Sequence, residues 1–162
     1  LPPRYPEYEF VIAGAPSTPV DFYDPFLKDH PAGLVINQTY PLLNSATAAL
    51  VTSGTATLET ALMGVPQVVC YKGNWISYQI AKRLITLKYI SLVNLIMDRQ
   101  VVTELIQEEL TTEHLAAELD KILSGPEREK QLEACADLRV KLGGPGASEK
   151  AAKLIVDFTS AR

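Results

Sequence analysis

The sequence predicts an α/β domain, a Rossmann-like parallel sheet with helices on both faces. Short continuous apolar runs alternate with segments of helical periodicity, and this alternation is typical of parallel strands that are buried on both faces. The chain has 162 residues, of which 47% are hydrophobic and 21% charged, which is enough for one full core. Its net charge of −4 argues against a nucleic-acid-binding protein, because such proteins usually carry a basic face.

Five apolar runs have the length and composition of buried strands. They are Phe10–Ala13, Gly33–Ile36, Ala48–Val51, Gln67–Tyr71 and Tyr89–Val93. Ligands of such sheets bind at the carboxyl ends of the strands, near the point where the strand order reverses. The residues that directly follow these runs are therefore the first candidates for a binding site.

Helical patterns separate the runs and dominate the second half of the chain. The expected helices are Val20–Lys28, Thr55–Met63, Trp75–Leu87, Thr103–Glu109, one that starts at Thr111, Pro126–Leu142 and Ala147–Thr159. Tyr40–Ala46 is expected to be a short helix or a turn. Gly64 with Pro66 marks the end of the helix Thr55–Met63. The glycine-rich stretch Gly143–Gly146 reads as a hinge, which divides the chain into residues 1–142 and residues 143–162. We expect the last helix to dock on another domain or on a second copy.

The most informative segment joins the third strand to its helix and reads Ser53-Gly54-Thr55-Ala56-Thr57-Leu58-Glu59. A loop of small residues before a helix leaves backbone N–H groups free, and the helix dipole favours an anion there. Glu59 lies about one turn into the helix, within reach of ribose hydroxyls. The segment therefore predicts a nucleotide-phosphate site, although Ser53 or Thr55 can also act as a plain N-cap and Glu59 as an ordinary solvated residue.

Further polar residues follow other strands. Gln38 and Thr39 come after the second strand, where a nucleobase would meet an amide and backbone groups. Lys72 is either a phosphate ligand or a solvated loop lysine, and Asn94 either donates to a ligand or caps a turn. Arg99 is able to bind a phosphate through two hydrogen bonds, or else pairs with a nearby carboxylate, Asp98 or Glu104.

The sequence gives little sign of a reactive thiol, a metal site or a membrane-spanning segment. Cys70 lies in an apolar run and is expected to be a buried thiol, and the two cysteines and two histidines lack metal-ligand spacing. No signal peptide or transmembrane span is visible. The helix around Lys82, Arg83 and Lys88 is basic beside apolar residues, which fits either a membrane-facing surface or an ordinary helix with one solvated face. The first residue, Leu1, is not an initiator methionine, and we expect the domain to come from a longer protein.

These motifs together resemble the lipid-A-disaccharide synthase family. The resemblance runs in order from about Phe10 to about Leu123, and its most specific parts are the segment Ser53–Glu59 and the segment from Lys88 to Asn94. Val65-Pro66, Val68-Val69, Tyr71-Lys72, Ala81–Leu84 and Glu104–Gln107 add to it. The family has a two-domain glycosyltransferase-B fold, and this chain resembles its carboxyl-terminal half, which binds the donor nucleotide.

The resemblance implies a reaction and its setting. 2,3-Diacylglucosamine would pass from its UDP derivative to 2,3-diacylglucosamine 1-phosphate, with inversion at the anomeric carbon and release of UDP. It implies a cytoplasmic protein peripheral to the inner membrane of a Gram-negative bacterium. No carboxylate pair at the strand ends suggests a metal site, and we expect no cofactor. The acceptor site and the catalytic base would lie in the amino-terminal domain, so no catalytic residue is expected in this chain.

The same resemblance assigns roles to single residues. Ser53, Gly54, Thr55 and Ala56 would hold the diphosphate, and Glu59 the ribose. The uracil would lie near Gln38 and Thr39, and Asn94 matches a family asparagine near the donor. Lys72 and Arg99 are added to the donor site for their charge and position and not for the resemblance. The final helix would cross to the amino-terminal domain, and a dimer through that helix is a further expectation.

Two other interpretations stay open. A UDP-N-acetylglucosamine 2-epimerase shares the Ser-Gly turn and a ribose-binding acid, although the segment from Lys88 to Asn94 resembles the synthase. A non-catalytic nucleotide-binding or scaffolding module is the second alternative.

Overall fold

A computed structural model describes residues 1–52, 54–73, 88–143 and 146–160. Its elements follow the order η1 (Pro2–Arg4), β1 (Phe10–Gly14), η2 (Val20–Phe22), α1 (Asp24–Leu27), β2 (Ala32–Ile36), α2 (Thr39–Ser45), β3 (Ala49–Thr52), α3 (Thr55–Leu62), β4 (Gln67–Tyr71), α5 (Leu92–Met97), β5 (Thr103–Ile106), η3 (Gln107–Glu109), α6 (Thr112–Leu123), α7 (Pro126–Lys141) and α8 (Ala147–Ser160). The expected helix Trp75–Leu87, with Lys82 and Arg83, lies outside the described residues.

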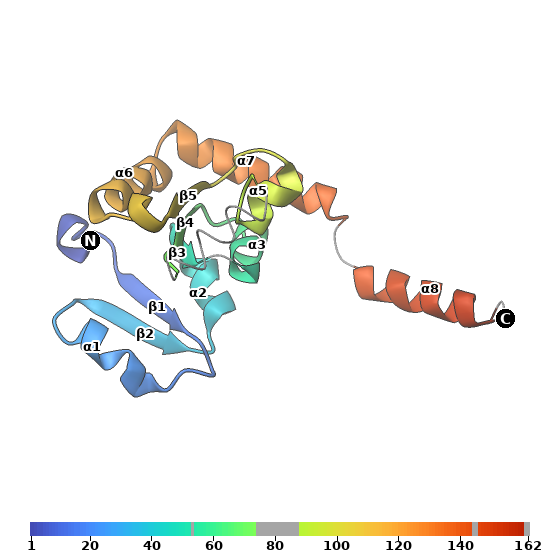
Figure 1. The fold of residues 1–162 in the computed structure, drawn as a ribbon, viewed down its shortest axis with the longest axis horizontal. Helices are drawn as coiled ribbons and strands as arrows, with labels where there is room; N and C mark the ends of the chain where they lie inside the picture. Colours follow the sequence, from blue (N-terminus) through green and yellow to red (C-terminus); the bar gives the residue numbers. More distant parts are fainter. Residues whose placement is uncertain (53, 74–87, 144–145, 161–162) are drawn as a thin grey trace.

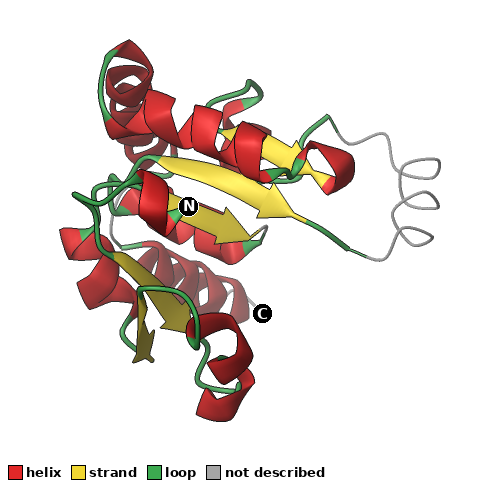
Figure 2. Ribbon diagram, turned by 90° about the vertical axis from the view of Figure 1, so that its left-hand side faces the viewer, coloured by secondary structure: helices red, strands yellow, loops and turns green. Residues whose placement is uncertain are grey.

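All described strands pair in parallel, which confirms the predicted α/β class. They form two sheets in place of the single sheet expected, with the orders β1-β2 and β3-β4-β5. In the larger sheet Val51 lies beside Val69, and Cys70 beside Leu105. Figure 2 shows the strands between layers of helices.

The core lies on both faces of β4. Val69 belongs to a cluster with buried residues of α3, α5 and α7, among them Ala61, Val93 and Leu138. The preceding residue, Val68, points to the opposite face, into a cluster with Leu119 of α6 and other apolar residues. Burial on both faces explains why this strand is a continuous apolar run rather than an alternating one.

Two predicted elements are wrong. The run Tyr89–Val93 forms no strand, because Ser91 caps a helix instead: its hydroxyl accepts a hydrogen bond from the Asn94 N–H at 3.3 Å, and α5 begins at Leu92. The expected helix Thr103–Glu109 is β5 followed by η3. Its first half pairs with β4 from Val68 to Tyr71, and this ladder outweighs the weak helical pattern.

The other helices in the described residues agree with the sequence within a few residues. The expected helix Val20–Lys28 is divided into η2 and α1. α3 ends before Gly64, which has a φ of 73° as a glycine stop requires. Thr111 caps α6 through a hydrogen bond from the N–H of His114.

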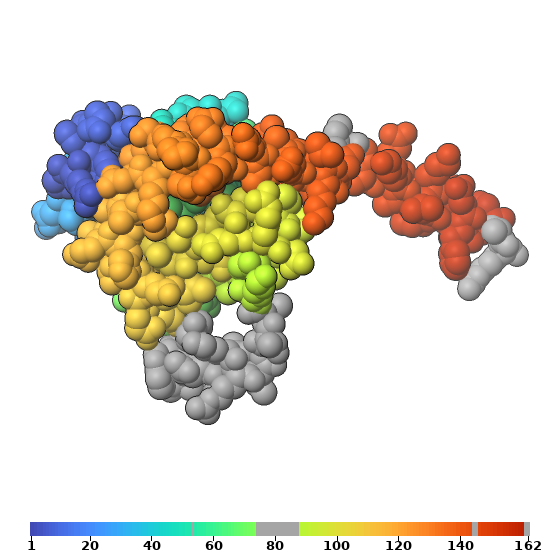
Figure 3. All heavy atoms as spheres, turned by 90° about the horizontal axis from the view of Figure 1, so that it is seen from above, coloured from blue at the N-terminus to red at the C-terminus, as the bar shows by residue number. Residues whose placement is uncertain are grey.

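α8 stands away from the body of the molecule (Figures 1 and 3), and all of its described residues are exposed. Its apolar side chains include Leu154, Ile155 and Val156, which are 59–70% exposed. Among the described helices, none is long and apolar enough to span a membrane.

Candidate functional site

The turn between β3 and α3 lies at the carboxyl edge of the larger sheet. β3 ends at Thr52 and α3 begins at Thr55. Gly54 between them has a φ of 117°, a backbone conformation that residues other than glycine rarely adopt. Apart from the chain neighbours of Gly54, no described residue has an atom within 4 Å of the position that a Cβ of Gly54 would take, so the turn is open on that side. Ser53 lies outside the described residues.

A buried threonine holds this turn in place. The carbonyl oxygen of Gly54 accepts hydrogen bonds from both the N–H and the hydroxyl of Thr57, at 3.2 and 2.8 Å. Thr57 is fully buried, and its own carbonyl oxygen accepts a hydrogen bond from the Gln67 side chain at 2.8 Å. Sequence reasoning did not select Thr57, although a threonine three residues after the glycine of a helix start is a recognisable sign of such a bond.

The start of α3 has hydrogen-bond donors to offer. Among the described residues, the N–H groups of Thr55 and Ala56 have no acceptor, as expected for the first turn of a helix. Thr55 is exposed and Ala56 half-buried. Glu59 lies four residues after Thr55, on the same side of the helix. Glu59 is half-buried, and its carboxylate forms no ion pair or hydrogen bond with another described residue.

Lys72 lies close to this turn along the edge of the sheet. Thr52 is the register partner of Cys70. Gly54 lies two residues after Thr52, and Lys72 lies two residues after Cys70, so both residues lie just beyond the ends of neighbouring strands. Lys72 is exposed and has no ion-pair partner among the described residues. The ends of β3 and β4 thus carry exposed N–H groups and a lysine, which are the kinds of group that bind anions.

A glutamine that the sequence reasoning missed holds the segment after Lys72. The side-chain amide of Gln107 donates to the carbonyl oxygen of Gly73 and accepts from its N–H, both at 3.3 Å. Gln107 is buried and has a left-handed φ of 53°. The pattern gave no sign of it, because the contact joins residues that lie 34 positions apart.

Gln38 and Thr39 lie at the carboxyl end of β2, in the smaller sheet. Asn37 turns the chain there with a φ of 55°, and Gln38 precedes the first residue of α2. Gln38 is exposed and Thr39 half-buried. No hydrogen bond joins these two side chains to the β3–α3 turn within the described part of the chain.

Asn94 is engaged within the protein. Its Nδ2 donates to the carbonyl oxygen of Val102 at 2.9 Å and to the carboxylate of Glu104 at 2.8 Å. Its Oδ1 accepts from the N–H groups of Val101 and Val102 at 2.7 and 3.0 Å. Because these bonds use both protons and both lone pairs of the amide, the side chain has no capacity left for a ligand.

Glu104 completes this network from β5. Its carboxylate accepts hydrogen bonds from the N–H groups of Ile90 and Ser91, both at 2.9 Å, just before α5. The sequence had indicated Glu104 as a partner for Arg99 and as part of the resemblance, and in the structure its carboxylate anchors the start of a helix.

Arg99 lies on the segment that leads into the amino end of β5, the edge opposite to the β3–α3 turn. Its guanidinium is 3.8 Å from the carboxylate of Asp137 on α7, and both side chains are more than half exposed. Neither Asp98 nor Glu104 is its partner in the described structure.

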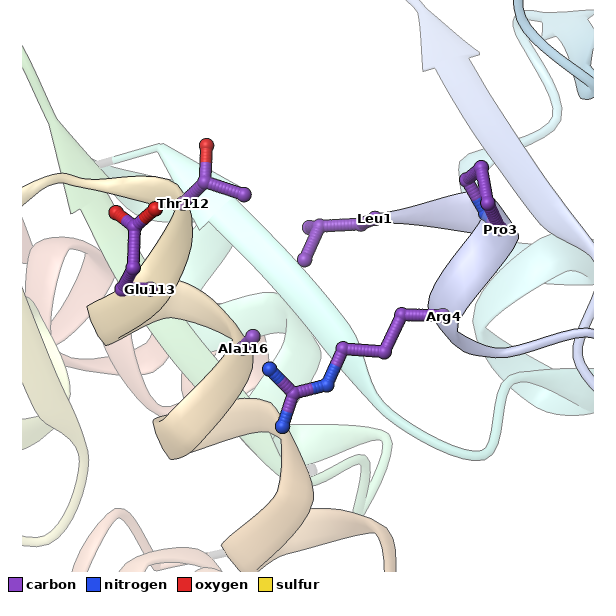
Figure 4. Close-up of a pocket in the computed structure, with 6 residues that line it drawn as sticks. All are labelled: Leu1, Pro3, Arg4, Thr112, Glu113 and Ala116. Carbon is purple, nitrogen blue, oxygen red and sulfur yellow. The ribbon is translucent and has the colours of Figure 1, made fainter.

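Surface hollows lie elsewhere. One of about 280 Å³ lies between η1 and α6 (Figure 4), and another of about 350 Å³ lies along β5 and α6. Neither is lined by a predicted site residue.

The described residues contain no cluster of three or more side chains suited to hold a metal ion. Burial raises the pKa of the Cys70 thiol to about 11, so the thiol stays protonated near neutral pH.

The family model and the curated relatives that match this chain all point to the same family. The family model described as lipid-A-disaccharide synthetase matches residues 24–158. The chain is similar to the lipid-A-disaccharide synthase of Syntrophus aciditrophicus, with 46% identity over 80% of this chain and 34% of the relative. It is 36% identical to that of Anaeromyxobacter dehalogenans over 94% of this chain and 41% of the relative. The synthase of Geobacter sulfurreducens is 35% identical over 96% of this chain and 41% of the relative.

The chain therefore spans 34–41% of the length of these relatives. Both the extent of the family match and the identity over most of the chain agree with the motifs in the sequence. The chain belongs to the lipid-A-disaccharide synthase family.

Proposed function

We propose that these 162 residues are the donor-nucleotide-binding half of an inverting glycosyltransferase of lipid A biosynthesis. The donor would be UDP-2,3-diacylglucosamine and the acceptor 2,3-diacylglucosamine 1-phosphate, with lipid A disaccharide 1-phosphate and UDP as products. The observation that carries the proposal is the turn at Gly54, where N–H groups, Glu59 and Lys72 without a partner among the described residues lie along one sheet edge.

The parts of this edge suit the parts of a nucleoside diphosphate. The N–H groups of Thr55 and Ala56, with Ser53 and Gly54, would bind the diphosphate, and Lys72 would add a positive charge. The Glu59 carboxylate would accept hydrogen bonds from the ribose hydroxyls. The uracil would lie by Gln38 and Thr39. The geometry supports Asn94 as a positioning residue for the neighbouring loop rather than a ligand contact, and it gives Arg99 least support.

Such a site would stabilise the leaving group. Negative charge develops on UDP as the glycosidic bond breaks, and groups aimed at that charge lower the barrier when they bind it more tightly in the transition state. A helix N-terminus contributes roughly 0.3–1 kcal/mol per charge, up to ~2 when partly buried. The proposed site needs no metal or cofactor for this function.

The remaining machinery would belong to the amino-terminal half. We place the catalytic base and the lipid acceptor site there, together with contacts to the inner-membrane surface, and we expect no transfer by this chain alone. α8 would cross to that half through its apolar side, and a dimer through α8 is a further expectation. Nucleic acid is not among the expected partners.

Titration calorimetry with UDP tests the site. We expect the chain to bind UDP and Glu59→Ala to weaken binding about 10-fold or more, because a hydrogen bond to a charged group contributes about 1.5–3 kcal/mol. Glu133→Ala on α7 is the matched control, since that carboxylate is exposed and far along the chain from the turn. An unchanged dissociation constant in Glu59→Ala would remove the ribose role.

Thermal shift distinguishes the alternatives. Stabilisation by UDP but not by NAD supports the UDP-sugar interpretation, and stabilisation by neither favours a non-catalytic module. Transfer measured with the purified 162-residue chain would contradict the assignment of the base to another domain.

A further inference from the structure

The candidate site residues follow the strands in a fixed order along the carboxyl edges of the two sheets. Figure 1 shows β3 between β4 and the smaller sheet, whose strand β2 leads to Gln38 and Thr39. The Gly54 turn follows β3, and Lys72 follows β4, on the side of the turn away from β2. Neighbouring strands lie about 4.8 Å apart, a distance that a lysine side chain spans. Lys72 is therefore within reach of the far end of a ligand that extends from Gln38 across the turn.

A side chain, in place of the strand ladder, holds the segment that carries Lys72. The pairing of β4 with β5 ends at Tyr71 and Ile106. Beyond this pair the backbone of Gln107 turns into η3 with a φ of 53°, so it does not continue the ladder. Its side-chain amide takes over, because it donates to the carbonyl oxygen of Gly73 and accepts from the Gly73 N–H, both at 3.3 Å. These two bonds fix the residue directly after Lys72.

The contact with Gly73 explains why a glutamine occupies position 107. A left-handed φ favours glycine or asparagine, so the backbone conformation alone does not select glutamine. Gln107 is only 6% exposed, and its amide bonds to no described residue other than Gly73. An unfavourable backbone conformation persists where the surrounding structure requires it, and such positions gather at functional sites.

The ring of Tyr71 holds Gly73 as well. A Cβ at Gly73 would lie 2.9 Å from the hydroxyl oxygen of Tyr71 and 3.2 Å from Cζ of its ring, so the phenol packs directly on the glycine. Lys72 lies between these two residues, and the protein thereby sets the position of its backbone. Its side chain, by contrast, is exposed and has no ion-pair partner among the described residues.

We propose that Lys72 binds the donor phosphate farther from the nucleoside and that Gln107 is the positioning residue for this contact. The inference rests on the proposed function, which assigns the uracil to the end of β2 and the diphosphate to the Gly54 turn. In that assignment the phosphate that carries the sugar lies towards β4. This phosphate takes up negative charge as the glycosidic bond breaks, so a cation fixed beside it stabilises the leaving group. Because a displacement of about 1 Å weakens such a contact strongly, the bonds that fix Gly73 affect the charge at Lys72.

Titration calorimetry with UDP and with UMP tests this inference, because UMP lacks the second phosphate. Gln107→Met keeps the length of the side chain and removes the amide. We expect it to weaken UDP binding about 5-fold or more, and UMP binding less than about 2-fold. Lys72→Ala should show the same selectivity for UDP. In the double variant, Gln107→Met should weaken UDP binding by less than about 2-fold beyond Lys72→Ala, since both substitutions affect one contact.

Two further variants separate positioning from a general effect on the fold. Gln107→Gly accepts the left-handed φ and also lacks the amide, so it should fold and show the same selectivity as Gln107→Met. Gln100→Met is the matched control, because Gln100 is exposed and precedes the amino end of β5. We expect it to change the binding of neither nucleotide.

The inference is overturned if the Gln107 variants weaken UDP and UMP equally, or affect neither. It is also overturned if the effects of Gln107→Met and Lys72→Ala on UDP binding add in full, because the two residues then act independently. Failure of the proposed function gives different results. A parent chain that binds no UDP overturns both proposals together, whereas unchanged UDP binding in Glu59→Ala removes the ribose role alone.

Discussion

At the scale of single residues, buried polar side chains fix loops at both edges of the larger sheet. Asn94 shows this clearly, because one fully buried amide satisfies three backbone groups and the Glu104 carboxylate. Gln107 does the same for Gly73, and Thr57 for Gly54. Buried backbone groups need such partners, and a group that loses its partner costs about 1–3 kcal/mol.

The first prediction at the scale of single residues is the stability of the Asn94→Ala variant. It leaves the N–H groups of Val101 and Val102 without their acceptor, so we expect the free energy of unfolding to fall by about 2–4 kcal/mol. Urea denaturation measures the change. Asn44→Ala is the matched control, because Asn44 is exposed on α2 and should cost less than about 0.5 kcal/mol. Equal stability of the two variants would contradict the structural role of Asn94.

The same residues show how far the sequence could predict the site. The Gly54 turn was predictable, because a small-residue loop and the helix after it are neighbours along the chain. The engagement of Asn94 and Gln107 was not, because their partners come from segments that only the fold brings together. Arg99 was selected for its charge alone, and its position at the opposite edge depends on where β5 begins.

At the scale of elements, tertiary pairing decided the two wrong assignments. The segment from Thr103 to Glu109 has mixed apolar and polar residues that fit either element, and its pairing with β4 selected a strand. The run Tyr89–Val93 has strand composition, yet Ser91 and the Glu104 carboxylate together cap a helix start there. Helices with strong local signs, such as α6 with Thr111 and α7 with Pro126, were predicted correctly.

The attachment of α6 to β5 predicts a pH dependence. Burial raises the pKa of Glu118, but hydrogen bonds from Lys121 and from Thr103 of β5 outweigh this effect and hold the pKa below its usual 4.5. Because the folded pKa is lowered, the contribution to stability is present above pH 4.5 and is lost as the pH falls through the folded pKa. Urea denaturation should find Glu118→Gln about 1 kcal/mol less stable than the parent at pH 7.

That difference should shrink as the pH falls below 4.5. Glu113→Gln is the control, because Glu113 is exposed on the same helix and forms no ion pair with a described residue. A difference between parent and Glu118→Gln that stays constant down to pH 2 would show that the carboxylate charge does not hold α6 on β5.

At the scale of the whole molecule, burial is unevenly distributed between the two sheets. In the described residues 1–46 only Tyr5, Gly14 and Leu43 are buried, whereas β4 alone buries Gln67, Val68 and Val69. The part that carries Gln38 and Thr39 is thus held less firmly than the part that carries the Gly54 turn. A sequence pattern predicts that strands exist, but it does not predict that their sheet is divided, because the division depends on which strands pair.

This distribution predicts two levels of local stability in the 162-residue chain. Opening β1 and β2 exposes no fully buried side chain of those strands, whereas opening β4 exposes two valines worth roughly 1.5–3 kcal/mol each. The amide of Ile12, which faces β2, should therefore exchange at least about 30-fold faster than that of Val69, corresponding to ~2 kcal/mol. Both residues are β-branched and lie within a strand, so their intrinsic exchange rates are comparable. Equal exchange rates, with the same dependence on urea, would mean that the two sheets open together as one cooperative unit.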